Sequence, residues 1–253
     1  MSMAIRTILL PAGLMLGLVA GFQSAQAATV TYCGPNVCYQ YNDAQNAGLF
    51  GSPSFVGDSV FWTPTTFEAR SADGVGIHSG TNTDTADQTW QFSKVWVGSW
   101  NGTSAVLNNA NEIASIWVHE EGDYLINYAA GEVHGDLYVA ARGLNNLIES
   151  TIINTDAFDQ VGTSGGIQLW NMDATLTPAV SLTQLANNMT LTIQNTLQAF
   201  TSDSTGGSEL AWIEKKLALT VITTNPVPVP AGLWLLGSAF GVLAVMRRRA
   251  LSA

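Results

Sequence analysis

The feature that most constrains this chain is a two-residue alternation of apolar and polar side chains that recurs through its middle. In the stretch 188–200, Leu191, Ile193, Leu197 and Ala199 fall on one side. Successive side chains of a β-strand point to opposite faces, so this alternation predicts strands with one buried and one solvated face. Antiparallel sheets accept such one-sided solvation, whereas the parallel sheets of βαβ folds are covered on both faces. The chain is therefore predicted to be all-β.

Further stretches repeat the pattern, and each has a predicted inward face. These faces comprise Val133, Leu137 and Val139; Trp90, Phe92 and Trp96; and Leu217, Leu219 and Val221. Residues 112–142 are predicted to form three strands joined by short glycine-bearing turns at 120–123 and 129–132. Only 182–189 has a pattern typical of a short helix. About a dozen short strands predict one antiparallel β-sandwich over residues 28–224, with jelly-roll connectivity as one option.

The first 27 residues have the composition of a secretory signal peptide. Arg6 precedes an apolar stretch over 8–22, and Ala25 and Ala27 form a small-x-small cleavage pattern. The alternative is a retained transmembrane helix, but the apolar stretch is short for a span of about 20 residues. We therefore expect export through the Sec translocon and cleavage by signal peptidase near Ala27.

The last 29 residues, 225–253, have three parts in order. A proline motif over 226–231 favours extended geometry and lacks the N–H groups that a ladder needs. An apolar run over 231–246 predicts a transmembrane helix, although it is shorter than an ideal span. Arg247, Arg248 and Arg249 follow it and predict that this end stays in the cytoplasm, with the large domain outside.

This tail resembles the PEP-CTERM sorting signal in its VPxPA-type variant. The resemblance rests on Val227, Pro228, Val229, Pro230 and Ala231, on the apolar run and on the arginine cluster, about 25 residues in all. Valine stands where the family name has glutamate. The resemblance implies that the chain is anchored briefly in the inner membrane, recognised by an exosortase and cut near the proline motif. It then reaches the cell surface or the exterior, where extracellular polysaccharide is an expected partner. A permanent single-span anchor is the alternative.

The charge of the domain narrows the choice of partners further. Without the two terminal segments, five basic residues remain against 19 acidic ones, a net charge of −14. Such a surface repels phosphate backbones, so nucleic acid is not an expected partner. It is compatible with neutral or basic partners and with divalent cations.

The two cysteines, Cys33 and Cys38, enclose the turn-forming residues Gly34, Pro35 and Asn36. In an exported chain this spacing predicts a disulfide across a hairpin. Half of a metal or redox site is the competing interpretation, but a second ligand pair and a CxxC motif are both missing.

The sequence offers weak catalytic candidates, and no enzyme activity or cofactor is predicted. Residues 162–166 match G-x-S-x-G, but a strand-like stretch follows where the nucleophile elbow needs a helix, and no histidine lies downstream. His119 and His134, on consecutive predicted strands near several acids, could hold zinc if the strands were adjacent. Glu120 and Glu132 could serve as a glycosidase pair only at a suitable separation, which the sequence does not fix.

Two binding features remain open. The oxygen-rich loop containing Asn82, Asp84 and Asp87 could hold a structural calcium, although its spacing is not that of an EF-hand. Residues 202–209 form a similar loop. Exposed tryptophans stack on sugar rings, and Trp62 and Trp100 are the candidates because each lies beside a turn. Trp90, Trp96 and Trp212 are expected in the core.

Three functions follow from these features. The first is a non-enzymatic envelope or matrix protein sorted by its tail. The second is a carbohydrate-binding module, which requires exposed tryptophans. The third is a secreted hydrolase, which requires histidines or carboxylates converging in a cleft.

Overall fold

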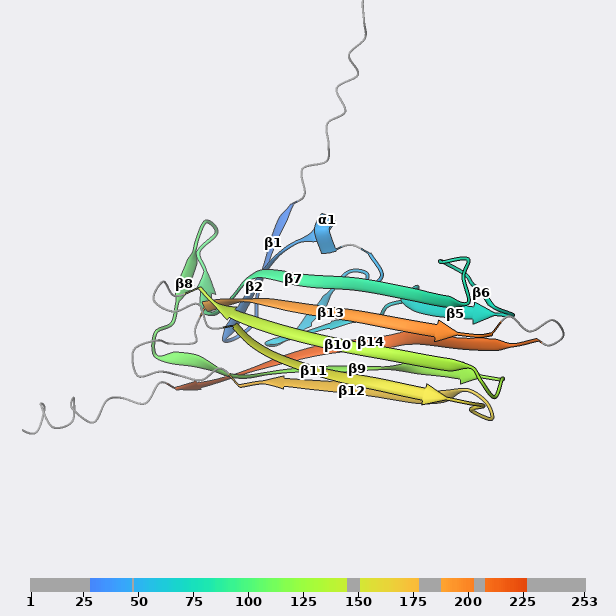
Figure 1. The fold of residues 1–253 in the computed structure, drawn as a ribbon. Coiled ribbons are helices and arrows are strands. Elements are labelled where there is room, and N and C mark those ends of the chain that lie inside the picture. Colours follow the sequence, from blue (N-terminus) through green and yellow to red (C-terminus); the bar gives the residue numbers. More distant parts are fainter. Residues whose placement is uncertain (1–27, 47, 145–150, 178–187, 203–207, 227–253) are drawn as a thin grey trace, which may run out of the picture.

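The computed structural model describes residues 28–46, 48–144, 151–177, 188–202 and 208–226, and most of these residues are in strands. The one helix among them is the single turn α1 (Asp43–Asn46). The strands form two antiparallel sheets of seven strands each, which lie face to face in a sandwich-like body (Figure 1). The predictions of an all-β class and of antiparallel pairing are confirmed for this part of the chain.

The first sheet has the order β1-β2-β7-β13-β10-β11, and β8 pairs with one end of β7. Its strands are β1 (Thr29–Cys33), β2 (Val37–Asn42), β7 (Thr83–Trp100), β8 (Ala105–Leu107), β10 (Glu132–Gly143), β11 (Thr151–Val161) and β13 (Asn188–Phe200).

The second sheet has the order β12-β9-β14-β4-β3. A further strand, β5, pairs with the first part of β14, before the part that pairs with β4, and β6 pairs with β5. Its strands are β3 (Ser54–Val56), β4 (Ser59–Trp62), β5 (Glu68–Ala72), β6 (Val75–Gly76), β9 (Asn111–Ile126), β12 (Gln168–Leu176) and β14 (Leu210–Pro226).

The inward faces predicted for β10 and β13 are confirmed. Val133, Leu137 and Val139 are buried on β10, and the predicted residues of β13 are buried as well. Between the sheets they join an aromatic cluster of Tyr39, Tyr41, Phe50, Trp62, Phe67, Trp90 and Phe92. Aromatic side chains bury a large area each, so this cluster is a main source of packing energy between the two sheets.

The predicted turn at 120–123 is wrong, because β9 runs without a break through these residues. Gly122 lies within the strand where two other groups come very close. A Cβ atom placed on it would lie 1.9 Å from the carbonyl oxygen of Glu214 and 2.9 Å from Nε1 of Trp170. The indole N–H donates to the carbonyl oxygens of Glu214 and Asp123, at 3.0 and 3.3 Å. The lack of a side chain at Gly122 allows this close approach between strands, which is a typical role of glycine inside a strand.

Bulges reverse two of the predicted faces. The pairing of β14 with β9 shifts between Lys215 and Leu217, so the buried residues beyond it are Ala218, Thr220 and Ile222. Leu217, Leu219 and Val221 therefore lie on the outer face, contrary to prediction. A bulge adds one residue to a strand, and an odd insertion reverses the side-chain alternation beyond it.

A second irregularity has the same effect on β7. The registers of β7 with β2 and with β13 both shift between Phe92 and Val95. Trp90 and Phe92 belong to the aromatic core as predicted, but Trp96 does not. Trp96 is fully buried, but it lies outside that cluster. Its ring centroid is 6.0 Å from that of Trp100, and its indole N–H donates to the carbonyl of Ser99.

The last strand continues slightly farther than the predicted domain boundary at residue 224. Asn225 and Pro226 pair with Glu112 and Asn111 of β9. No helix in the described part of the chain is long and apolar enough to cross a membrane. The predicted membrane helix over 231–246, the signal peptide and most of the predicted helix over 182–189 lie outside the described residues. The last two residues of that helix, Asn188 and Met189, belong to strand β13.

Candidate functional site

The strongest candidate site is on the outer face of the second sheet, where β9 and β12 lie side by side. Alternation along β9 directs Trp117, His119 and Glu121 outward. The register pairs His119 with Asp173 and Glu121 with Asn171 on β12. Residues 50 or more positions apart in the sequence therefore become neighbours on one surface.

Asp173 holds this group together. Its Oδ1 accepts from Nε1 of Trp117 and contacts Nδ1 of His119, both at 2.9 Å, and its Oδ2 accepts from the amide of Asn171 at 3.2 Å. Its backbone N–H donates to Asp156 of β11 at 2.7 Å. Partial burial alone would raise the pKa of Asp173, but the contacts with His119, Trp117 and Asn171 outweigh it and lower the pKa. The carboxylate is thus held ionised and oriented.

The two rings of the site are stacked. The centroids of Trp117 and His119 are 5.3 Å apart and their planes differ by 24°. Both side chains are partly exposed. The other ring nitrogen of His119 lies 3.5 Å from the Glu121 carboxylate, so the imidazole stands between two acids.

A shallow hollow of about 340 Å³ adjoins His119. It combines an apolar wall, an amide and three charged side chains. Its lining is His119, Glu121, Gly122, Asp123, Leu169, Trp170, Asn171 and Lys216. Leu169 is 83% exposed, an unusual state for a leucine. An apolar surface with a few placed polar groups is typical of ligand sites.

The arrangement offers groups that can bind a polar ligand. An Asp–His pair can also act as a general base on a water or a substrate hydroxyl within hydrogen-bond reach. The second ring nitrogen of His119 lies beside the Glu121 carboxylate. A tryptophan edge beside hydrogen-bonding groups can receive a neutral polar ligand such as a sugar ring.

The two histidines considered for zinc do not meet. His119 lies on β9 in the second sheet and His134 on β10 in the first, because the chain crosses from one sheet to the other between them. His134 contacts Asp159 through Nδ1 and Asp136 through Nε2, the latter at 2.7 Å. No cluster of three or more His, Cys, Asp or Glu side chains suited to a metal is present among the described residues.

The glutamate pair also separates. Glu120 is fully buried and bonded to Lys215, whereas Glu132 is exposed on β10 in the other sheet. Burial of Glu120 corrects its interpretation as a surface acid. Ser164, the central residue of the G-x-S-x-G match, lies in the loop between β11 and β12. Its hydroxyl contacts backbone groups of Ile126 and Gly166, consistent with a structural loop.

The oxygen-rich loop predicted over 81–88 is strand from Thr83 onward, because β7 begins there, and backbone groups outside it hold Asp84. The buried carboxylate of Asp84 accepts from the N–H groups of Arg70 and His78 at 2.8 Å and of Ser79 at 3.1 Å, and it contacts the His78 ring at 2.8 Å. These donors occupy the oxygens that a calcium ion would need. The second loop lies mostly outside the described residues, and its ends, Ser202 and Glu209, bond to each other.

The predicted sugar-stacking pair is corrected in part. Trp62 is only 1% exposed and packs against Trp90, at 5.1 Å between centroids, because β4 faces the aromatic core. Trp100 is half-buried at the β7–β8 hairpin, with its ring tilted against that of Trp96. Trp212, expected in the core, is half-exposed on the outer face and donates to Glu68.

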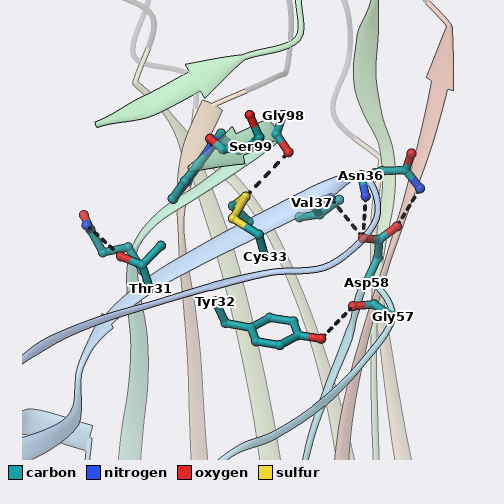
Figure 2. Close-up of a disulfide and its surroundings, with 12 residues drawn as sticks. Thr31, Tyr32, Cys33, Asn36, Val37, Gly57, Asp58, Gly98 and Ser99 are labelled. Carbon is teal, nitrogen blue, oxygen red and sulfur yellow. Dashed lines mark hydrogen bonds between the residues drawn. A yellow bond between two sulfur atoms is a disulfide. The ribbon is translucent and has the colours of Figure 1, made fainter. Parts of the chain in front are cut away.

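The predicted disulfide between Cys33 and Cys38 is confirmed, and it closes the β1–β2 hairpin. Figure 2 shows this hairpin held against the β3–β4 turn by Asp58, whose carboxylate accepts from the backbone of Asn36 and Val37 at 2.9 Å and from the Asn36 amide at 2.8 Å. Gly34 allows the approach, because a Cβ atom there would lie 2.1 Å from the carbonyl of Gly57. The hairpin thus joins the first sheet to the second.

The remaining predicted site residues lie outside the described residues. They are Ala25 and Ala27 of the cleavage pattern, Val227, Pro228, Val229, Pro230 and Ala231 of the proline motif, and Arg247, Arg248 and Arg249.

Sequence analysis missed Trp117 and Asp173 as partners. The alternation in 168–176 places Asp173 on a polar face, so its outward position could be predicted from the local sequence. Its contact with Trp117 depends on the pairing of β12 with β9, which follows from the topology of the whole sheet.

No family model and no curated protein matches the chain. Among solved structures, infectious bursal disease virus is similar over 73% of this chain in its Gt strain (14% identity, TM-score 0.28) and 77% in its Gx strain (12%, 0.30). Eiger TNF from S. frugiperda is similar over 67% of this chain and 94% of its own (10%, 0.25). The chain spans 42% and 38% of the two viral chains. Likenesses this weak assign neither a function nor a detailed fold.

Proposed function

We propose that this chain is an exported, non-enzymatic protein of the cell envelope or extracellular matrix, sorted by its C-terminal tail and released by an exosortase. The observation that carries the proposal is the order of features in the tail, where a proline motif, an apolar run and an arginine cluster follow one another. β14 pairs with β9 through Pro226, and the residues on which the resemblance rests begin at Val227. A protease acting on 227–231 would leave this ladder complete.

Two further features support an exported domain. The Cys33–Cys38 disulfide is of a kind that persists in oxidising compartments. The net charge of −14 favours solubility and disfavours binding to anionic surfaces. We also propose jelly-roll connectivity for this domain, since the two sheets establish only the sandwich-like class.

The tail is tested by expressing the full chain in a Gram-negative host with and without an exosortase. With the enzyme, mass spectrometry of the released protein should give a C-terminus within or just before the motif 227–231. Replacing Pro228 and Pro230 together by alanine should leave the chain in the membrane fraction. Asn225→Ala, a change on the folded ladder, is the control and should be processed normally. A released protein that retains Arg249 would refute processing.

A second candidate function is binding of a neutral polysaccharide at the hollow between β9 and β12. The observation that favours it is the partly exposed Trp117–His119 stack, oriented by Asp173 beside that hollow. Stacking on an aromatic ring is worth about 1 kcal/mol beyond the area that it buries.

Affinity electrophoresis in neutral exopolysaccharide tests this site. Trp117→Ala and Asp173→Ala should each abolish the retardation of the wild-type domain. Trp100→Ala, on the first sheet, is the matched control and should bind as the wild type does. Equal loss in all three variants, or loss only with Trp100→Ala, would place binding elsewhere.

A further inference from the structure

Three polar side chains meet inside the core, between the two sheets. Lys215 of β14 and Glu120 of β9 come from the second sheet, and Asn195 of β13 comes from the first. Lys215 is 1% exposed, and Glu120 and Asn195 are fully buried. Buried ionisable groups carry a large desolvation cost, so such a cluster within an aromatic core requires an explanation.

The lysine lies in an aromatic cradle, where its amine pairs with Glu120. Its Nζ is 2.8 Å from Oε2 of Glu120, and 4.7 and 4.5 Å from the ring centroids of Phe50 and Phe67. Burial lowers the pKa of Lys215 to about 8, an effect that Glu120 only partly offsets. A lysine with such a pKa is readily present as the free amine, which is nucleophilic.

The glutamate lies next to both the amine and the amide. Burial raises the pKa of Glu120, although contacts with Lys215 and with the amide of Asn195 oppose the rise. Burial thus shifts both the amine and the carboxyl toward their neutral forms. A protonated carboxyl beside an amine can donate one proton and accept another.

The amide of Asn195 is the second anomaly. It lies close enough to Glu120 to lower that group's pKa, yet neither its nitrogen nor its oxygen has a partner of ordinary hydrogen-bond geometry in the described structure. The Oε1 atom of Glu120 also lacks a partner. Native proteins rarely leave buried polar atoms unpaired, and each such atom costs stability.

We propose that Lys215 and Asn195 form an intramolecular amide bond, with Glu120 transferring the protons. The neutral Nζ of Lys215 attacks Cγ of Asn195 while Glu120 donates a proton to Oδ1. Glu120 takes one proton from Nζ of the tetrahedral intermediate and passes it to Nδ2. The bond between Cγ and Nδ2 then breaks and Nδ2 leaves as ammonia, while Oδ1 returns its proton to Glu120 as the carbonyl re-forms. One C–N bond forms and one breaks, so the step requires no oxidant, cofactor or other reactant.

The core supplies what this reaction needs. The fold holds the groups together and replaces a bimolecular encounter by a unimolecular step. Exclusion of water prevents hydrolysis of the intermediate. The product also resolves the anomalies, because its N–H can donate to Glu120 and the buried charges disappear. The new bond would join β13 of the first sheet to β14 of the second.

The direct test is the intact mass of the full chain, purified from the fraction in which it accumulates, with its termini established by peptide mapping. After correction for the disulfide, the mass should be lower than the sequence mass by one ammonia. Cleavage after Glu209 and Glu214 separates Asn195 from Lys215 in the sequence. The two peptides should nevertheless remain joined. An unmodified mass would overturn the proposal.

Variants test the role of each group, and near-UV circular dichroism shows which of them fold. Asn195→Ala and Glu120→Gln should both keep the full sequence mass. Asn195→Asp should lose water instead of ammonia, because its leaving group is hydroxide. Lys216→Ala, an exposed neighbour, should lose ammonia as the wild type does.

Two results would contradict the assignment even if ammonia or water were lost. Ammonia loss mapped to Asn101–Gly102 would indicate a succinimide. Water loss mapped to Lys215 and Glu120 would indicate a bond between the ion-pair partners. The wild-type mass and peptide map decide the proposal by themselves if the variants do not fold.

Discussion

Gly122→Ala should destabilise this domain strongly, although the substitution adds only one methyl group. The new Cβ would lie 1.9 Å from the carbonyl oxygen of Glu214. That oxygen belongs to the backbone of the neighbouring strand, so it cannot move aside as a flexible side chain would. Overpacking of this kind costs about 1–3 kcal/mol.

A second cost comes from the indole of Trp170. Its Nε1 would lie 2.9 Å from the new methyl group, and it donates 3.0 Å to the same carbonyl of Glu214. Loss of this hydrogen bond from a buried tryptophan adds about 1–2 kcal/mol. The sum is about 2–5 kcal/mol, which corresponds to a melting temperature lower by about 5–15 °C for a domain of this size.

Equilibrium unfolding in urea, followed by tryptophan fluorescence, measures this loss. Gly143→Ala is the matched control, since no atom lies within 4 Å of its added Cβ and the residue also belongs to a strand. Gly135→Ala is an intermediate case, where the nearest atom is the flexible Cε of Met172 at 3.3 Å. If Gly122→Ala unfolded within about 0.5 kcal/mol of the wild type, the argument from close approach would be refuted.

Three other perturbations have predictable outcomes. Replacing Cys33 and Cys38 by serine opens a loop with a sequence separation of 5 and should reduce the free energy of unfolding by about 2 kcal/mol; no change in urea midpoint would show that the hairpin is held by its docking contacts alone. Partial burial lowers the pKa of His134, but hydrogen bonds to its two aspartate partners outweigh it and raise the pKa. The resulting stability is fully present below about pH 6.5 and is lost as pH rises through the folded pKa, so His134→Gln should be less stable than wild type at acidic pH and nearly equal at alkaline pH. Asp84→Ala leaves three backbone N–H groups without their acceptor and should cost about 2–4 kcal/mol in thermal unfolding, with a wild-type midpoint contradicting this role.

The faces of single strands were predictable wherever the alternation is local and unbroken. Val133, Leu137 and Val139 are buried as expected because one strand without a bulge determines their parity. The disulfide was predictable for the same reason, since a hairpin between close cysteines depends on the few residues between them. Local patterns are sufficient when nothing farther along the chain intervenes.

Long-range effects account for the wrong predictions. Leu217 faces outward because a bulge two residues earlier reverses the alternation, and the sequence contains no separate signal for that bulge. Gly122 was interpreted as a turn residue because its true partner, Trp170, lies on another strand. Glu120 was interpreted as a solvated acid because Lys215, which accompanies it into the core, is 95 residues away.

The candidate site was likewise predictable only in its local features. Its polar residues could be assigned to outer faces from the alternation of each strand. Their convergence required knowledge that β12 pairs with β9 and that Asp173 stands opposite His119. A binding surface made from residues of two strands far apart in the sequence is visible only once the sheet order is known.

The pairing of β14 up to Pro226 has a mechanical consequence if the tail is a membrane anchor. Only four residues, 227–230, separate that ladder from the start of the apolar run at Ala231. Fully extended, they reach about 14 Å. The anchored domain would stand on the bilayer with the β8 end of the sandwich facing the lipid headgroups, since β8 and the end of β14 lie at the same end (Figure 1). The folded body would therefore stay within about 14 Å of the membrane until the short connection is cut, and the cut would free it to diffuse away.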